Sequence, residues 1–192
     1  DIHAGGQDLI FPHHENEIAQ SEAATGQPFA RYWMHNGYIN VDNQKMSKSL
    51  GNFRLVREIA QEFDLEAVRL FLLGTHYRNP VNFSRELVEQ SETALARIRT
   101  ARERLEEAPL GDTPEADAAF MQALEGHRAS FYAAMDDDLN TADALGAFFD
   151  FIRALNTFVS EPHGRAPLSG AVALFEDVCR VFGILQHKKE EE

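Results

Sequence analysis

Apolar side chains recur at helical spacing over most of the chain beyond residue 52. Between residues 84 and 107 an apolar stripe repeats every three or four positions, which predicts one long helix. Three more such stripes follow between residues 115 and 186. The members of the four stripes are Leu87, Ala94, Ile98, Ala101 and Leu105; Phe120, Leu124, Phe131 and Met135; Leu145, Phe149, Ile152, Leu155 and Val159; and Val172, Phe175, Cys179 and Phe182. The pattern predicts a mainly α-helical chain that ends in an antiparallel helical bundle.

The first 52 residues mix helix and strand signals. A helical pattern runs from about residue 12 to residue 24, and Thr25 and Gly26 end it. Residues 38–41 alternate as a strand, after which Asp42 and Asn43 turn the chain into a loop, so we expect a short β-hairpin here. Two short apolar groups, at residues 56–63 and 67–73, predict two short helices before the long one.

Composition limits the classes of protein to which the chain can belong. The net charge of -13 disfavours nucleic-acid binding, because proteins that grip phosphates usually carry a basic surface. Cys179 is the only cysteine, which excludes a disulfide framework, and its apolar neighbours predict a buried thiol. No apolar run reaches the roughly 18 residues of a transmembrane helix, and no signal peptide is apparent. We therefore expect a protein of the reducing cytoplasm with no membrane contact.

Two lysines lie three positions apart in the segment Lys-Met-Ser-Lys-Ser at residues 45–49. Serines and the following Gly51 soften this loop, so Lys45 and Lys48 can form a movable cationic clamp. Such a clamp suits polyphosphate transfer, in which negative charge develops on the leaving group. A solvated surface loop is the alternative that so short a basic cluster, taken by itself, leaves open.

The segment at residues 45–49 resembles the signature of class I aminoacyl-tRNA synthetases, and its surroundings are similar to the cysteinyl-tRNA synthetases. The similar segments are residues 1–22, which begin Asp-Ile-His-Ala-Gly-Gly-Gln-Asp; residues 32–37; residues 70–73, 76–78 and 82–84; and residues 136–141, which read Asp-Asp-Asp-Leu-Asn-Thr. These segments are spread over nearly the whole chain. The resemblance outweighs the acidic composition and implies a protein that handles tRNA.

The resemblance also implies how the chain is organised. Residues 1–52 would be the C-terminal part of a class I, Rossmann-like catalytic domain, and residues 53–108 would be stem-contact helices. Residues 109–114 would be a linker, residues 115–186 the helical bundle, and residues 187–192 a frayed tail. The family's other signature motif and its extreme C-terminal domain are missing, so we expect a fragment that is inactive by itself.

The implied parent reaction is ATP-dependent activation of cysteine to cysteinyl-adenylate, followed by transfer to the 3′ end of tRNA(Cys). ATP would be a substrate, accompanied by Mg2+, and the parent protein would be a monomer. The family holds Zn2+ with two cysteines, one histidine and one glutamate. His13 and Glu17 match the last two, and both cysteines would precede residue 1. The spacing of four places His13 and Glu17 on one helix face, although a surface pair, or a pairing of His14 with Glu17, satisfies the same pattern.

Other positions match the family's binding site. They are His3 for the cysteine pocket; Gly5, Gly6, Asp8, Met34 and His35 for ATP; and Lys48, with Lys45 in support, for the ATP phosphates. Cysteine differs from serine by one atom, which an apolar pocket discriminates poorly. A zinc ion discriminates better, because a thiolate is a softer and stronger ligand than a hydroxyl group.

Two other functions compete with this interpretation. The cysteine ligase of mycothiol synthesis shares the adenylation step and the zinc but uses an aminosugar acceptor, and residues 36–52 look more like the synthetase. A non-catalytic helical module that binds protein or RNA is the second alternative. The long helix carries Arg97, Arg99, Arg102 and Arg104. These arginines would contact an RNA backbone if the module binds RNA, or only solvent, because glutamates are interleaved with them.

Overall fold

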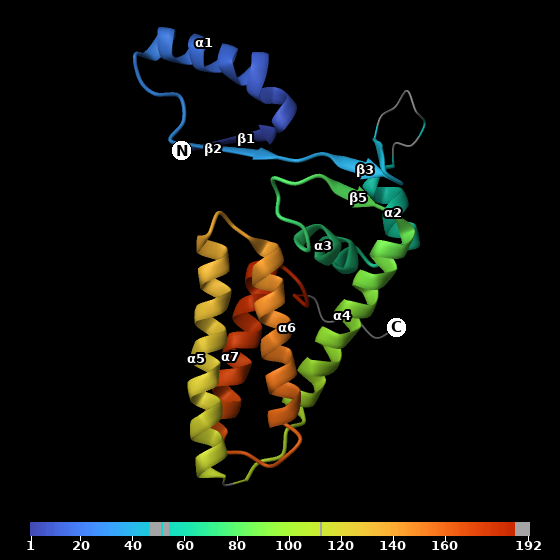
Figure 1. Cartoon of the computed structure of the whole chain (residues 1–192), viewed down its shortest axis with the longest axis vertical. Helices are drawn as coiled ribbons and strands as arrows, with labels where there is room; N and C mark the ends of the chain where they lie inside the picture. Colours follow the sequence, from blue (N-terminus) through green and yellow to red (C-terminus); the bar gives the residue numbers. More distant parts are fainter. Residues whose placement is uncertain (47–50, 52–53, 112, 187–192) are drawn as a thin grey trace. The chain divides into compact units, whose positions relative to one another are not determined.

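The computed structural model describes residues 1–46, 51, 54–111 and 113–186. It divides into two compact units, which are described separately (Figure 1). Unit 1 comprises Asp1–Arg54 and Thr75–Ser84, and unit 2 comprises Leu55–Gly74 and Arg85–Glu192. The functional boundaries expected at residues 52, 108 and 114 stay predictions, and the expected frayed tail lies outside the described residues.

Unit 1 begins with a strand–helix–strand connection. Strand β1 (Ile2–Gly6) pairs in parallel with strand β2 (Tyr32–Asn36). Between them lie the helical turns η1 (Gln7–Leu9) and η2 (Ile10–His14) and helix α1 (Glu15–Thr25). The predicted helix is therefore present, and it is preceded by an irregular segment in which Phe11 is extended, with φ -138° and ψ 133°.

The predicted hairpin is also present in unit 1. Strand β3 (Ile39–Val41) pairs antiparallel with β4 (Gln44–Lys45), and Asp42 and Asn43 form the turn with φ of 48° and 62°. Positive φ at both central residues is typical of the two-residue turn that matches the twist of a hairpin. On its other edge β3 pairs in parallel with β5 (Val81–Phe83), which makes a three-stranded sheet.

In the part of unit 2 that the structure describes, the regular elements are helices, and Leu110 and His163 form an isolated β-bridge. The helices are α2 (Val56–Glu62), α3 (Leu65–Leu73), α4 (Arg85–Glu106), α5 (Pro114–Asp136), α6 (Thr141–Phe158) and α7 (Arg165–Phe182). Helices α5, α6 and α7 lie side by side along their lengths (Figure 1). The mainly helical fold with a terminal bundle is thus confirmed.

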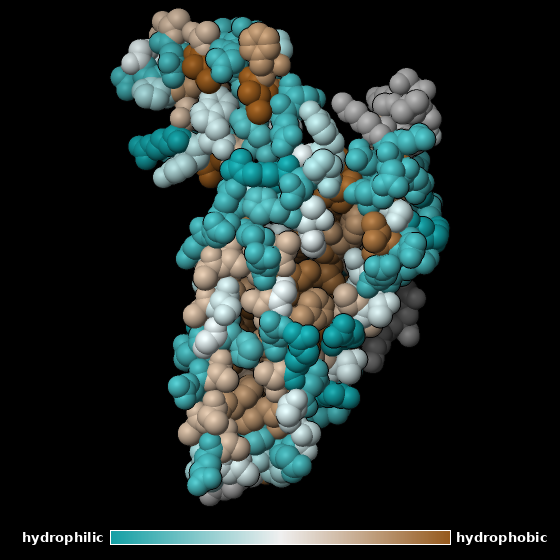
Figure 2. All heavy atoms as spheres, viewed as in Figure 1, coloured by the Kyte–Doolittle hydropathy of each residue, from teal (hydrophilic) through white to brown (hydrophobic). Residues whose placement is uncertain are grey.

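One hydrophobic core joins helices α3 to α7 of unit 2. It includes Leu95 and Ile98 of α4 together with the buried faces of α5, α6 and α7, so α4 packs into the bundle core rather than beside it. In α6 the rings of Phe148, Phe151 and Phe158 are buried, whereas the predicted Phe149 is only half-buried. Because apolar residues occupy both faces of this helix, packing decides which face turns inward. Figure 2 shows apolar side chains between the helices and polar ones over much of their outer surface.

A partly buried polar cluster ties the start of α5 to the segment before α7. Nδ1 of His163 lies 2.8 Å from Oδ1 of Asp117 and 2.8 Å from Oγ1 of Thr113. The other carboxylate oxygen of Asp117 accepts a hydrogen bond from the backbone N–H of Gly164. The segment before α5 is thereby fastened to the segment before α7.

Four of the arginines of α4, at positions 97, 99, 102 and 104, contact neighbouring groups of unit 2. Arg99 pairs with Asp64 and Glu66 of the α3 region, at 2.8 and 2.9 Å. Arg102 donates hydrogen bonds to Glu106 and to the Leu185 carbonyl, and Arg104 donates to Asn156. The guanidinium of Arg97 lies over the Phe149 ring. These contacts give all four arginines a role within the protein.

Cys179 lies in the core of unit 2, as its apolar neighbours predicted, and it is 4% exposed. Burial raises the pKa of its thiol to about 12, so the group is neutral and unreactive at neutral pH. Among the described residues, no helix combines the length and the apolar composition needed to cross a bilayer.

Candidate metal and nucleotide site

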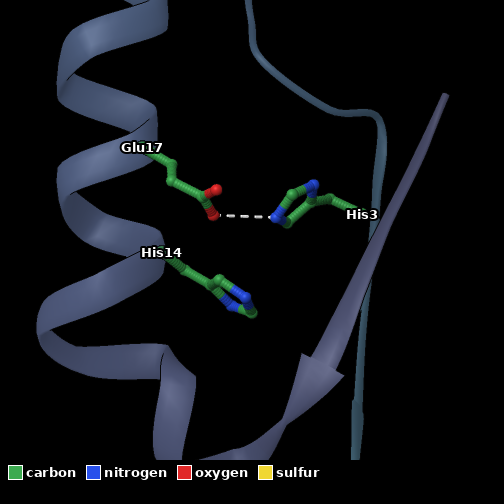
Figure 3. Close-up of side chains that lie close together, drawn as sticks. All are labelled: His3, His14 and Glu17. Carbon is green, nitrogen blue, oxygen red and sulfur yellow. Dashed lines mark hydrogen bonds and ion pairs between the residues drawn. The ribbon is translucent and has the colours of Figure 1, made fainter.

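The first turn of α1 brings Glu17 between two histidines. Oε2 of Glu17 lies 2.8 Å from Nε2 of His3 on β1, and Oε1 lies 3.6 Å from Nε2 of His13. Figure 3 shows that the His3 and Glu17 side chains point toward one another from strand and helix. The predicted pair of His13 and Glu17 thus shares one helix face, and His3 of the predicted cysteine pocket joins it.

His14 differs from its neighbour His13 in exposure, although their ring centroids lie only 5.8 Å apart. The His14 residue is 3% exposed, whereas the side chain of His13 is 59% exposed. Nδ1 of His14 lies 2.8 Å from Nε2 of His35 on β2, and its ring packs edge-on against His3. Burial, followed by the charges of His3 and His35, lowers the pKa of His14 despite an opposing effect of Glu17. His14 is therefore neutral at neutral pH, and one of its ring nitrogens keeps a lone pair that can bind a metal ion or accept a hydrogen bond.

The described residues offer two ways to hold a metal ion. Ligand atoms of His3, His14 and Glu17 all lie within 4.8 Å of one another (Figure 3). The second set is His13 with Glu17, whose facing atoms are 3.6 Å apart. Imidazole nitrogens and a carboxylate are typical zinc ligands, so the chemistry of either set fits this ion. Glu17 belongs to both sets.

Packing explains the glycine at position 5. A Cβ atom on Gly5 would lie 2.8 Å from Cδ1 of Leu9 and 3.2 Å from the ring of His14. On Gly6 the atom would meet only the movable carboxylate of Asp8, at 2.5 Å. Glycine at position 5 therefore leaves room for the buried ring of His14, independently of any nucleotide.

Three of the remaining predicted site residues have a described backbone, which lies on strands β2 and β4. Met34 and His35 are half-buried on β2, and the ring of His35 stacks on Trp33 at 6.2 Å. The backbone of Lys45 ends β4. Lys48 and the side chain of Lys45 lie outside the described residues.

Sequence reasoning missed the part that His14 and His35 play together. It named His14 only as a rival partner of Glu17, and it gave His35 an ATP role. No local period marks the contact, since 21 positions separate the two residues. The cluster of histidines and aromatic residues in the first 35 positions was the one available signal.

Residues 1–93 match the family of class I (C) tRNA synthetase catalytic domains, and residues 130–186 match the DALR domain. The chain is 53% identical over its whole length to a cysteine–tRNA ligase of Caldicellulosiruptor saccharolyticus, of which it covers 42%. It is 48% identical to that of Bacillus licheniformis, covering 99% of this chain and 41% of the relative. The chain is similar to these cysteine–tRNA ligases over its whole length. It spans about two fifths of the length of these relatives.

Solved class I synthetases have the same fold. The agnB2 LeuRS of Agrobacterium radiobacter K84, in ternary complex with tRNA and LeuAMS, matches with a TM-score of 0.74 at 20% identity, over 95% of this chain and 25% of the other. Methionyl-tRNA synthetase of Mycobacterium tuberculosis with methionyl-adenylate matches with a TM-score of 0.62 at 21% identity, over 95% of this chain and 40% of the other. At these identities the matches support the fold alone.

Proposed function

We propose that this chain supplies part of an ATP-dependent cysteine–tRNA ligase, which forms cysteinyl-adenylate and transfers the cysteinyl group to the 3′ end of tRNA(Cys). The observation that carries the proposal is the 53% identity to a cysteine–tRNA ligase over the whole of the chain. Substrates of the complete protein would be cysteine, ATP and tRNA(Cys). It would act as a monomer in the cytoplasm, and the chain by itself would be inactive.

His13 and Glu17 would hold the zinc ion that selects cysteine. Two ligands of one tetrahedral zinc, at about 2.0–2.1 Å from the metal, lie about 3.4 Å apart. The 3.6 Å between Nε2 of His13 and Oε1 of Glu17 is close to that separation. In His3–Glu17 the 2.8 Å contact is instead that of a hydrogen bond, which leaves His3 to line the pocket. When bound, the zinc supplies a preference for thiolate over hydroxyl.

The ATP site would be formed by the turn after β1 and the strand beside it. Gly5 and Gly6 would let the backbone approach the nucleotide, and Asp8 would accept hydrogen bonds from ribose hydroxyl groups. The backbone at Met34 and His35 would face the adenine. The parallel pairing of β1 with β2 supports this assignment, because it sets Gly5 opposite His35.

Lys48, supported by Lys45, would neutralise the charge that develops on the phosphates as pyrophosphate leaves, and Mg2+ would accompany ATP. Similarity to cysteine–tRNA ligases extends over the whole of this chain. It favours this function over the two alternatives, an aminosugar ligase and a non-catalytic module.

Pyrophosphate exchange tests the assignment of Lys48. The assay uses a protein of the same length as the relatives that contains this sequence, called the full-length protein below. Lys48→Ala should slow cysteine-dependent exchange by about 30- to 1,000-fold, because the lost cation stabilises charge mainly in the transition state, and should leave the KM for cysteine nearly unchanged. Arg165→Gln, an exposed charge on α7, is the matched control. A normal exchange rate with reduced tRNA affinity would mean that the segment at residues 45–49 contacts RNA instead.

A further inference from the structure

The loop before β5 carries a stack of three flat side chains that the proposed site does not use. The rings of His76 and Tyr77 are stacked, with centroids 5.0 Å apart and planes 23° from parallel. The guanidinium carbon of Arg78 lies 5.1 Å from the centroid of the Tyr77 ring. Both rings are half-buried and Arg78 is exposed. An imidazole, a phenol and a guanidinium therefore follow one another on one loop.

Backbone contacts fix this loop beside the proposed nucleotide site. The Gly37 N–H donates to the Tyr77 carbonyl at 2.8 Å, and the Gln7 side chain donates to the Arg78 carbonyl at 2.9 Å. Gln7 directly follows the Gly5–Gly6 pair, and Gly37 directly follows β2. A Cβ atom on Gly37 would lie 2.4 Å from the backbone of Asn79, so the close approach needs glycine there. The stack is thus held at the edge of the segments assigned to ATP.

Charge at this loop is opposite to that of the chain as a whole. Residues 75–84 include Arg78 and His76 but no aspartate or glutamate, whereas the net charge of the protein is -13. Aromatic rings accept nucleobases by stacking, and an adjacent arginine contacts either the base plane or the phosphate. Exposed bases of this kind occur in single-stranded nucleic acid and not inside a duplex.

We propose that His76, Tyr77 and Arg78 form a stacking site for single-stranded RNA, and that its occupant is the 3′ end of the tRNA acceptor strand. The second half of this statement rests on the proposed ligase function. An acceptor end must come close to the adenylate before the cysteinyl group is transferred, and Gln7 places this loop beside the segment assigned to the nucleotide. A base would extend the stack on the two rings, and Arg78 would hold the phosphate that follows it.

Fluorescence anisotropy of the 192-residue chain with a fluorescein-labelled single-stranded RNA hexamer tests the site directly. Tyr77→Leu, which keeps much of the side-chain volume without the π face, should weaken binding by about 10- to 100-fold, and Tyr77→Phe should restore it. Arg78→Gln should weaken binding and lower the slope of log affinity against log salt by about 0.7, the value for one phosphate. Arg165→Gln, on α7, is the charge-matched control.

Two results of the same assay would overturn the proposal. Unchanged affinity in both Tyr77→Leu and Arg78→Gln would remove the site, and so would equal binding of a hexamer duplex. Fluorescence of Trp33, the only tryptophan, reports whether unit 1 is folded in each variant. If Tyr77→Leu fails to fold, the exposed Arg78→Gln variant decides the question through its salt slope.

Kinetics of the full-length protein separate this proposal from the proposed function. Tyr77→Leu should leave cysteine-dependent pyrophosphate exchange unchanged and slow the transfer of cysteine to tRNA by about 10- to 100-fold. An equal loss in exchange would make the loop part of adenylate formation and overturn the RNA assignment. If the wild-type protein shows no exchange, the ligase function fails, and the hexamer assay still decides whether the loop binds single-stranded RNA.

Discussion

Nδ1 of His14 lies 2.8 Å from Nε2 of His35, so a single hydrogen joins two imidazoles from helix and strand. His14 is buried, and Gly5 leaves room for its ring. The contact links the segment proposed to hold zinc to the strand proposed to face adenine. The orientation of the proposed amino-acid pocket would therefore depend on a residue of the proposed nucleotide pocket.

Replacing His35 with leucine should destabilise unit 1 by about 1–3 kcal/mol, because it leaves the buried Nδ1 of His14 without a partner. The measurement is urea unfolding followed by fluorescence of Trp33, whose ring packs against both histidines. His35→Gln keeps a hydrogen-bonding group and is the control. Equal stability of the leucine variant and the wild type would show that the histidine contact contributes nothing.

Zinc content of the full-length protein distinguishes the two ligand sets. Changes to residues that only support the ligands typically lower metal affinity by about 10- to 100-fold. His13→Asn and Glu17→Gln should each lower zinc affinity by more than this. His14→Asn should keep one equivalent of zinc through dialysis against a mild chelator. Retention by His13→Asn together with loss in His14→Asn would assign the metal to His3, His14 and Glu17 instead.

The core position of Ile98 predicts that α4 stabilises the bundle. Its side chain is fully buried in the cluster shared with α6 and α7, so Ile98→Ala should lower the free energy of unfolding of unit 2 by about 2–5 kcal/mol. Glu103→Ala, an exposed change on the same helix, is the control and should change stability little. Thermal unfolding followed by circular dichroism measures both. A loss below about 1 kcal/mol would mean that α4 is dispensable to the core.

Asp117 predicts how the stability of unit 2 depends on pH. Desolvation acts to raise the pKa of this carboxyl, but hydrogen bonds from Gly164, His163 and Thr113 outweigh it and lower the pKa below its ordinary value of 3.8. Because the folded state binds the proton less tightly, the stabilisation is complete well above pH 3.8 and is lost as the pH falls through the lowered pKa. The difference in melting temperature between wild type and Asp117→Asn should therefore be largest near neutral pH and shrink in acid. A difference that is constant with pH would contradict the prediction.

The helical half of the fold could be predicted because its signal is local. The buried positions of α5 and α7, such as Phe131 and Phe175, follow the period of the helix in the sequence itself. Phe149 of α6 shows where this fails: Phe148, Phe149 and Phe151 offer apolar groups to both faces, and only packing chooses between them. Strand β2 escaped prediction, because residues 32–36 are not alternately buried and their partner, β1, lies some 30 positions away.

The site was predictable only in part, for a similar reason. His13 and Glu17 lie on one helical turn, so their spacing alone brings them together. His3 with Glu17 and His14 with His35 are contacts between distant positions, created by the parallel pairing of β1 with β2. The extended backbone of Phe11, which precedes the two histidines, is marked in the sequence only by Pro12, because a proline disfavours helical backbone at the residue before it.

Transfer of labelled cysteine by the full-length protein tests the central claim most directly. The protein is incubated with ATP, radiolabelled cysteine and tRNA(Cys), and label in precipitated RNA is counted, with serine in place of cysteine as the control. The proposed function predicts ATP-dependent labelling of the tRNA by cysteine and none by serine. No ATP-dependent labelling of tRNA, or transfer of the label instead to an aminosugar acceptor supplied in a parallel reaction, would contradict it.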